Sequence, residues 1–143
     1  DVHLWTQGEP HESPYWFPCF DSPNERSTSE VICHVPNDFV VLSNGDKIDE
    51  RPKDNAQKAV HWRQDLPHVN YLICLVAGKF HSISDVHKSV PLAFYVQPSL
   101  ADYAQNSFHE TKSMMEFFES EIGVPFPWSQ YNQVTIRDFT AGG

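Results

Sequence analysis

The chain has 143 residues, of which 40% are hydrophobic, 13% aromatic and 20% charged. This composition is typical of a folded chain with a packed core and excludes a disordered protein. The formal net charge of -9 excludes a nucleic-acid partner, because a phosphate backbone requires a basic surface.

Membrane insertion and a disulfide scaffold are not indicated. No apolar run reaches the roughly 18 residues that a membrane-spanning helix needs, so no membrane span is expected. Cys19, Cys33 and Cys74 lie far apart, and three cysteines cannot form a closed disulfide framework. We interpret them as free, buried thiols, although a pairing of any two stays open. The chain begins with Asp1, and the sequence gives no indication of the compartment.

The first 97 residues have the pattern of short strands. Four prolines at nearly regular spacing make residues 1–28 irregular and exclude a helix there. From residue 29 the period becomes that of strands, and five short extended segments are expected, which together indicate an all-β layer. The features in chain order are a strand with Val31, Cys33 and Val35 closed by Pro36, a strand at Phe39 to Leu42, a turn at Asn44-Gly45, a polar loop or hairpin tip from Asp46 to Gln57, an extended run with Val60, Trp62 and Gln64, a buried strand from Val69 to Phe80 bent at Gly78, and a strand from Val90 to Val96.

A long helix follows at residue 98. Ser99 is a candidate N-cap, with Asp102 three residues on, and Gly123 is placed to end the helix before Pro125. An apolar stripe repeats at spacings of four and three, which is one helix face. Its members are Ala104, Phe108, Thr111, Met115, Phe118 and Ile122. The acidic residues here (Glu110, Glu116, Glu119 and Glu121) are interpreted as a solvated helix face, with an acidic cleft for ammonium groups as the alternative.

The change of period predicts two domains. An all-β domain is expected over residues 1–98, and a second unit over residues 99–143 has one helix and a strand at Gln133 to Phe139. One helix and one strand cannot close a core, so we expect a truncated domain. The stripe should then be partly uncovered, and exposed apolar area of that size favours self-association.

The residue types needed for catalysis are not arranged for it. A zinc helix requires two histidines four residues apart with a glutamate after the first. His11-Glu12 is followed by Ser13, Pro14 and Tyr15, which break the motif and the helix, and His109-Glu110 has Ser113 in the place of the second histidine. A zinc site from scattered strand histidines such as His34, His61 and His68 is the less favoured alternative. No serine or cysteine stands in a nucleophile motif.

Two short segments are candidates for recognition. Gln7-Gly8-Glu9 places an amide and a carboxylate two residues apart, so in an extended segment both would point the same way. A carboxylate in a cleft pairs well with a primary ammonium group. The Gly142-Gly143 end is either a turn or a place where a ligand backbone comes close.

Several motifs carry a resemblance to a known family. They are W-T-Q-G-E-P-H-E-S-P-Y-W-F-P-C-F-D-S-P-N-E-R-S-T-S-E (Trp5 to Glu30), W-R-Q-D-L-P-H-V-N-Y-L (Trp62 to Leu72), L-A-F-Y (Leu92 to Tyr95), E-I-G-V-P-F-P-W (Glu121 to Trp128) and D-F-T-A-G-G (Asp138 to Gly143). Over nearly its whole length and in the same order, the chain resembles the zinc aminopeptidases that include aminopeptidase N and the leukotriene hydrolases.

The resemblance implies an architecture and a function. It implies a saddle-like all-β amino-terminal domain, followed by a helix and a strand that begin a thermolysin-like catalytic domain. Gln7 would line the pocket for the first substrate side chain, and Glu9 would bind the free α-ammonium group of a peptide. Gly142 and Gly143 would begin the G-x-M-E-N exopeptidase signature and bond the peptide backbone. The zinc ligands would lie beyond Gly143, so the fragment itself is expected to be inactive.

The first hypothesis is therefore an amino-terminal fragment of a zinc aminopeptidase, whose partners are peptides with a free amino terminus and the remainder of its own catalytic domain. The family often has a further acidic or arginine residue where this chain has His11-Glu12-Ser13-Pro14, which leaves the preferred first residue open. The alternative is a non-catalytic β-sandwich module that binds carbohydrate or protein through Trp5, Trp16 and Trp62. Core packing is the commoner role of such tryptophans.

Overall fold

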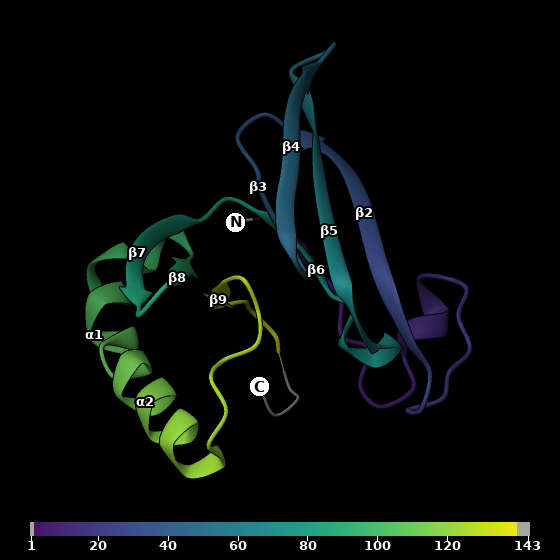
Figure 1. The fold of residues 1–143 in the computed structure, drawn as a ribbon. Helices are drawn as coiled ribbons and strands as arrows, with labels where there is room; N and C mark the ends of the chain where they lie inside the picture. The colour runs from purple at the N-terminus through teal and green to yellow at the C-terminus, as the bar shows by residue number, and fades with distance from the viewer. Residues whose placement is uncertain (1, 140–143) are drawn as a thin grey trace. The chain divides into compact units, whose positions relative to one another are not determined.

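The computed structural model describes residues 2–139 and is mainly β (Figure 1). The chain divides into two compact units, residues 1–79 and residues 80–143. The predicted boundary near residue 98 concerns domains of a longer protein and stays a prediction.

The larger sheet of the first unit has the order β2-β5-β4 and is antiparallel throughout (Figure 1). Its strands are β2 (Arg26–Pro36), β4 (Asp46–Lys53) and β5 (Gln57–Val69). In β5 the side chains of Val60, Trp62 and Gln64 are buried while Arg63 is exposed, which is the alternation predicted from the sequence.

The second sheet of this unit has the order β1-β6-β3, with β1 at His3–Trp5, β3 at Val40–Ser43 and β6 at Leu75–Gly78. A hydrogen bond joins the two sheets: the indole Nε1 of Trp62 donates to the carbonyl oxygen of Val41 over 3.1 Å. The ring of Trp62 is 4% exposed, and it packs in a core whose other apolar members are Val35, Val41, Leu42, Val60, Ile73, Val76 and Ala77.

Three expectations for this unit need correction. Asp46–Lys53 is a strand and not a loop, because its backbone pairs with β5 and its polar side chains suit a half-exposed sheet; only the tip at residues 54–56 turns. The run from Val69 is not one bent strand, since a 3-10 helix at Asn70–Leu72 precedes β6. A 3-10 helix also forms at Ser13–Tyr15, where Pro14 sits in its first turn, a position that needs no N–H.

The second unit packs one sheet against two helices. β7 (His81–His87) and β8 (Val90–Val96) form an antiparallel hairpin, and β9 (Tyr131–Val134) runs parallel to β8. Leu92, Phe94 and Met115 form the core. Phe94 stacks on Phe108 with ring centroids 4.8 Å apart, which fixes the first helix on the sheet.

The predicted single helix is interrupted. A 3-10 helix at Pro98–Tyr103 leads into α1 (Ala104–Phe108), and α2 (Thr111–Ile122) begins only after a turn at residues 109–110. Local hydrogen bonds accompany the break, because Ser107 Oγ donates to the Tyr103 carbonyl and His109 Nδ1 lies 2.7 Å from the carbonyl of Asn106.

Of the two predicted ends of the helix, the first is wrong and the second is confirmed. Ser99 does not cap the helix: the residue before the first turn is Gln97, and no side chain caps that turn. Gly123 ends α2 as predicted, in the left-handed conformation with φ of 75°, and its N–H donates to the carbonyl of Glu119.

The last predicted strand also ends early. β9 stops at Val134, although the Thr135 N–H still donates to the Tyr95 carbonyl. Beyond this point the side chain of the buried Gln97 makes the contacts with Thr135. Gln97 Nε2 donates to the Thr135 carbonyl over 2.8 Å, and the Thr135 hydroxyl donates to Gln97 Oε1 over 2.9 Å.

Candidate functional site

The candidate recognition segment follows directly after β1. Two hydrogen bonds attach Thr6, the residue between β1 and this segment, to the start of β6: the Thr6 N–H donates to the Leu75 carbonyl over 3.0 Å, and the Leu75 N–H donates to Thr6 Oγ1 over 2.9 Å. The segment therefore leaves the sheet from a fixed point.

Gly8 is buried and lies against the backbone of the neighbouring 3-10 helix. A Cβ atom at this position would come within 2.6 Å of the Tyr71 carbonyl oxygen and 2.5 Å of Ser13 Oγ. The Gly8 carbonyl accepts from the Glu12 N–H over 2.9 Å, which closes the turn that follows. Only glycine allows this close approach, so the residue between Gln7 and Glu9 serves as the anchor of the segment.

Gln7 and Glu9 are brought together by a side-chain bond and not by strand alternation. Glu9 begins a turn, and its peptide bond to Pro10 is cis. Its N–H donates to Gln7 Oε1 over 3.3 Å. The segment is not part of a strand, and the expectation that both side chains point the same way stays a prediction. Gln7 is half-buried, whereas Glu9 is exposed and its carboxylate is accessible to a ligand.

Asn70 braces the segments around this site, and the sequence analysis missed it. Its side-chain amide donates to the Phe20 carbonyl over 3.1 Å, and its Oδ1 accepts from Ser27 Oγ over 3.0 Å. Its own carbonyl accepts from the buried Ser13 hydroxyl over 3.2 Å. Asn70 is 8% exposed. Its position in the motif W-R-Q-D-L-P-H-V-N-Y-L is the only feature of the sequence that pointed to it.

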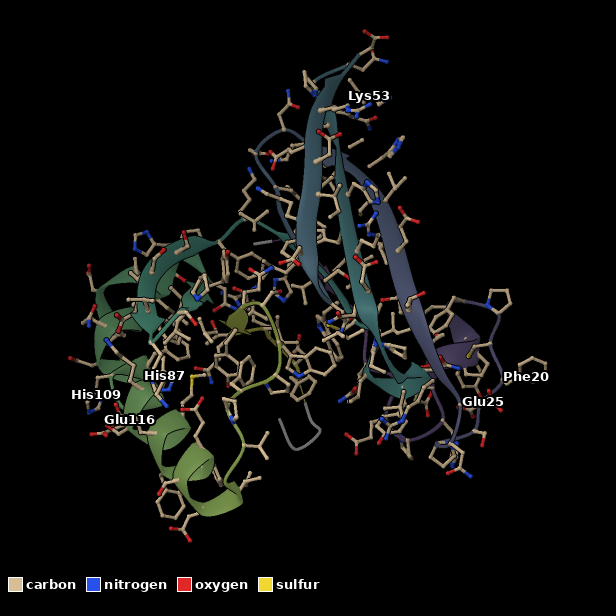
Figure 2. All side chains as sticks on the ribbon, in the orientation of Figure 1. Phe20, Glu25, Lys53, His87, His109 and Glu116 are labelled. Atoms are coloured by element: carbon tan, nitrogen blue, oxygen red, sulfur yellow. The ribbon has the colours of Figure 1, made fainter. Side chains whose placement is uncertain are left out.

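The loop of the F-P-C-F-D stretch borders a hollow of about 590 Å³. In this loop His11 Nδ1 lies 3.0 Å from Asp21 Oδ2, and the rings of Trp16 and Phe17 meet edge to face. The ring of Phe20 is 83% exposed and projects from the loop away from the strands (Figure 2). The hollow continues along residues 25–32 of the chain.

The structure places one of the three candidate tryptophans and all three cysteines. Trp62 is a core residue, so it cannot contribute to a binding surface of the alternative β-sandwich module. Cys19, Cys33 and Cys74 are free thiols, as expected, but each is only partly buried. Burial raises the pKa of the Cys33 and Cys74 thiols, which therefore stay protonated at neutral pH.

The described residues do not form a zinc site. Within residues 2–139 no three His, Cys, Asp or Glu side chains gather closely enough to hold a metal ion. Four of the described histidines each pair with a single carboxylate, as in His61 with Glu30 at 2.6 Å. Zinc needs three or four such donors around one point, so this arrangement does not fit it.

Glu119 is the centre of a partly buried polar cluster in the second unit. Its Oε2 lies 2.6 Å from Lys88 Nζ and 2.9 Å from Nε2 of the buried His87, and its Oε1 accepts from the Phe126 N–H. His87 lies beside α2 in Figure 2. Hydrogen bonds from Lys88, His87 and the Phe126 backbone lower the pKa of Glu119 to about 2. Glu119 is thus not part of a solvated acidic face; it ties the β7–β8 hairpin to α2.

The carboxyl-terminal half of the apolar stripe is uncovered, as predicted. Ala104 and Met115 are buried, whereas Phe118 is 57% and Ile122 68% exposed. These side chains border an apolar groove of about 510 Å³ between α2 and the loop to β9. Its other walls include Met114, Val124, Pro125, Phe126, Pro127 and Tyr131. Gly142 and Gly143, the remaining predicted site residues, lie outside the described residues.

Comparison with known proteins identifies the family. The model of the peptidase M1 N-terminal domain matches residues 1–72, which is half of the chain. The chain belongs to the M1 peptidase family. The matched part contains β1 to β5, the Gln7-Gly8-Glu9 segment and Asn70.

Relatives named as aminopeptidases match nearly all of this M1 chain. It is 30% identical to glutamyl aminopeptidase of Rattus norvegicus over 138 residues, 96% of the chain and 15% of the relative. It is 31% identical to aminopeptidase M1 of Arabidopsis thaliana over 96% of the chain and 16% of the relative. Aminopeptidase N of Streptomyces lividans is 29% identical over 99% of the chain and 17% of the relative. The chain thus spans about a sixth of the length of these relatives. No helix within residues 2–139 is long and apolar enough to cross a membrane.

Proposed function

We propose that this chain is the amino-terminal part of a zinc-dependent aminopeptidase that removes amino-terminal residues from peptides. The observation that carries the proposal is the match of the M1 N-terminal domain to residues 1–72, continued by aminopeptidase relatives over 96% of the chain. The role of the chain is recognition of the substrate's amino end, and the zinc ligands are supplied by residues beyond it.

Glu9 binds the free α-ammonium group of the peptide, and Gln7 lines the pocket for the first side chain. Three features of the site support these roles. The Glu9 carboxylate is exposed, the Thr6 and Gly8 contacts fix its backbone, and the Gln7 amide oxygen is bonded to the Glu9 N–H. A carboxylate whose backbone is fixed needs little further ordering when it meets an ammonium group, and a charge-assisted hydrogen bond contributes more than a neutral one.

Gly142 and Gly143 complete the substrate site by hydrogen bonding the peptide backbone as an added strand. A zinc ion held by residues outside this chain would supply Lewis-acid chemistry for polarising the scissile carbonyl and activating water. The residues described here hold the amino end at one place, which selects the first peptide bond for cleavage.

The apolar groove beside α2 is covered by the remainder of the catalytic domain. Phe118 and Ile122 are more exposed than large apolar side chains on a helix of a complete domain usually are. The groove that they border is lined almost wholly by apolar side chains. In the isolated chain the same surface drives self-association.

The proposed function is tested by hydrolysis of an aminoacyl-anilide. The full natural polypeptide that contains residues 1–143 should hydrolyse it, and a zinc chelator should abolish the activity. The purified 143-residue chain should hydrolyse none and bind no stoichiometric zinc. Chelator-sensitive hydrolysis by the 143-residue chain itself would contradict the proposal.

A further inference from the structure

The two outer strands of the β2-β5-β4 sheet differ in how their free edges are protected. Six of the eight residues of β4 are charged, and Pro52 removes a backbone donor. Charges and proline on an edge strand prevent other strands from pairing with it. β2 has eleven residues, its only proline is the last one, and residues 27–33 include a single charge at Glu30. Both strands have one register irregularity, at Ser27/Ser29 in β2 and at Lys47/Asp49 in β4, but the β2 edge lacks the charges and the internal proline that protect the β4 edge.

The outer backbone of β2 is open in the described structure. Within residues 2–139, β2 pairs with β5 alone and is the outermost strand of its sheet (Figure 1). In an antiparallel sheet about half of the N–H and C=O groups of an edge strand point away from its partner. An eleven-residue edge thus presents a row of unused donors and acceptors.

The hollow of about 590 Å³ lies along this edge. It is lined by the consecutive residues 25–32, by the aromatic loop 16–20, and by Asn70 and Ile73. Because successive side chains of a strand point to opposite faces, a hollow lined by consecutive residues follows the strand edge. Its walls carry exposed apolar side chains, with Phe20 83% and Ile32 61% exposed.

Backbone groups repeating along an edge select an extended strand as their partner. We propose that a β-strand from another part of the same polypeptide, outside residues 1–143, pairs with the outer edge of β2 and places apolar side chains in the hollow. A transient partner would leave the β2 edge exposed whenever it dissociates. An edge that is exposed in this way needs protection against pairing with other strands, like that of β4. The proposal rests on the proposed function only in assuming that residues 1–143 belong to a longer polypeptide. The relatives leave room for such a strand, since the matched region is only 15–17% of their length.

Hydrogen–deuterium exchange of the β2 amides tests the proposal. In the 143-residue chain the inward amides, bonded to β5, should exchange slowly, and the outward amides should exchange nearly as fast as in an unfolded peptide. In the full natural polypeptide the outward amides should slow by roughly 100-fold or more. Equal, fast exchange of the outward amides in both would overturn the proposal.

The same data distinguish other occupants. Slow outward amides in the 143-residue chain that depend on its concentration would show a second copy on the edge, and slow exchange only after addition of a separate peptide would show an external ligand. Either result overturns the proposal. Aminopeptidase activity is measured independently, so an inactive polypeptide with protected outward amides contradicts the proposed function and leaves the strand intact.

A pair of matched variants gives a second test. Ile32→Lys places a charge in the hollow, and Ile48→Lys places one on the protected β4 strand, where Ile48 is 46% exposed. Ile32→Lys should lower the melting temperature of the full polypeptide and leave that of the 143-residue chain nearly unchanged. Ile48→Lys should change neither. Equal effects of Ile32→Lys in the two proteins would overturn the proposal.

Discussion

The carbonyl oxygen of Tyr71 lies only 2.6 Å from the place that a Cβ atom on Gly8 would occupy. This contact joins the start of the chain to the 3-10 helix before β6, and it sets the position of the two side chains that flank Gly8. The recognition segment is therefore held by backbone packing, and its polar side chains remain available for a ligand.

Gly8→Ala should destabilise the first unit by about 1–3 kcal/mol, because a methyl group in this space forces the Tyr71 backbone or the Ser13 side chain to move. The displacement would also move Glu9, so the full polypeptide should lose kcat/KM. Denaturant unfolding measures the first effect. Gly123→Ala is a useful comparison, because nothing lies within 4 Å of its Cβ. Its φ of 75° alone costs about 1–2 kcal/mol, and the loss should fall on the second unit. A Gly8→Ala variant as stable as the parent would contradict the packing argument.

Acid should destabilise the second unit through Glu119. Its folded pKa of about 2 lies below the ordinary value of 4.5, so the carboxylate contributes stability that is complete above pH 4.5. That contribution declines as the pH falls towards 2. The melting temperature of Glu119→Gln should therefore lie below that of the parent at pH 6, with the difference shrinking between pH 4.5 and pH 2.

The control for this experiment is Glu116→Gln on the same helix, since Glu116 is exposed. It should match the parent at every pH. A Glu119→Gln deficit that is constant from pH 6 to pH 2 would show that the variant damages packing and not a charge network.

Sequence analysis predicted the parts of the fold that depend on side-chain periodicity. The burial of Val60 and Trp62 on one face of β5 and the end of α2 at Gly123 follow from local patterns, and the structure confirms both. Local patterns do not predict a structure that depends on a tertiary contact. Asp46–Lys53 looks like a loop because six of its residues are charged, yet pairing with β5 makes it a strand.

The same division applies to the candidate site. A sequence motif is enough to identify Gln7 and Glu9 as candidates. The hydrogen bond from the Glu9 N–H to Gln7 Oε1 depends on a turn, and side-chain periodicity does not predict it. The bracing role of Asn70 joins residues 43 and 50 positions apart in the sequence. Such a role follows only from the folded chain.

The isolated chain should self-associate through the exposed end of the α2 stripe. Phe118→Lys combined with Ile122→Lys removes apolar surface and adds charge, so it should shift the chain towards monomer in sedimentation velocity experiments. Tyr15→Lys, at an aromatic residue that is 84% exposed outside the stripe, should not change the association. Association that responds equally to both changes would argue against the groove as the contact surface.

The central claim is that Glu9 binds the amino end of the substrate, and kcat/KM of the full polypeptide tests it most directly. Glu9→Gln keeps the size of the side chain and removes its charge. The loss of a charge-assisted hydrogen bond of about 1.5–3 kcal/mol should lower kcat/KM for an aminoacyl-anilide by about 10- to 100-fold. Glu12→Gln, at an exposed carboxylate three residues on, should retain the parent value. A Glu9→Gln enzyme as active as Glu12→Gln would contradict the account.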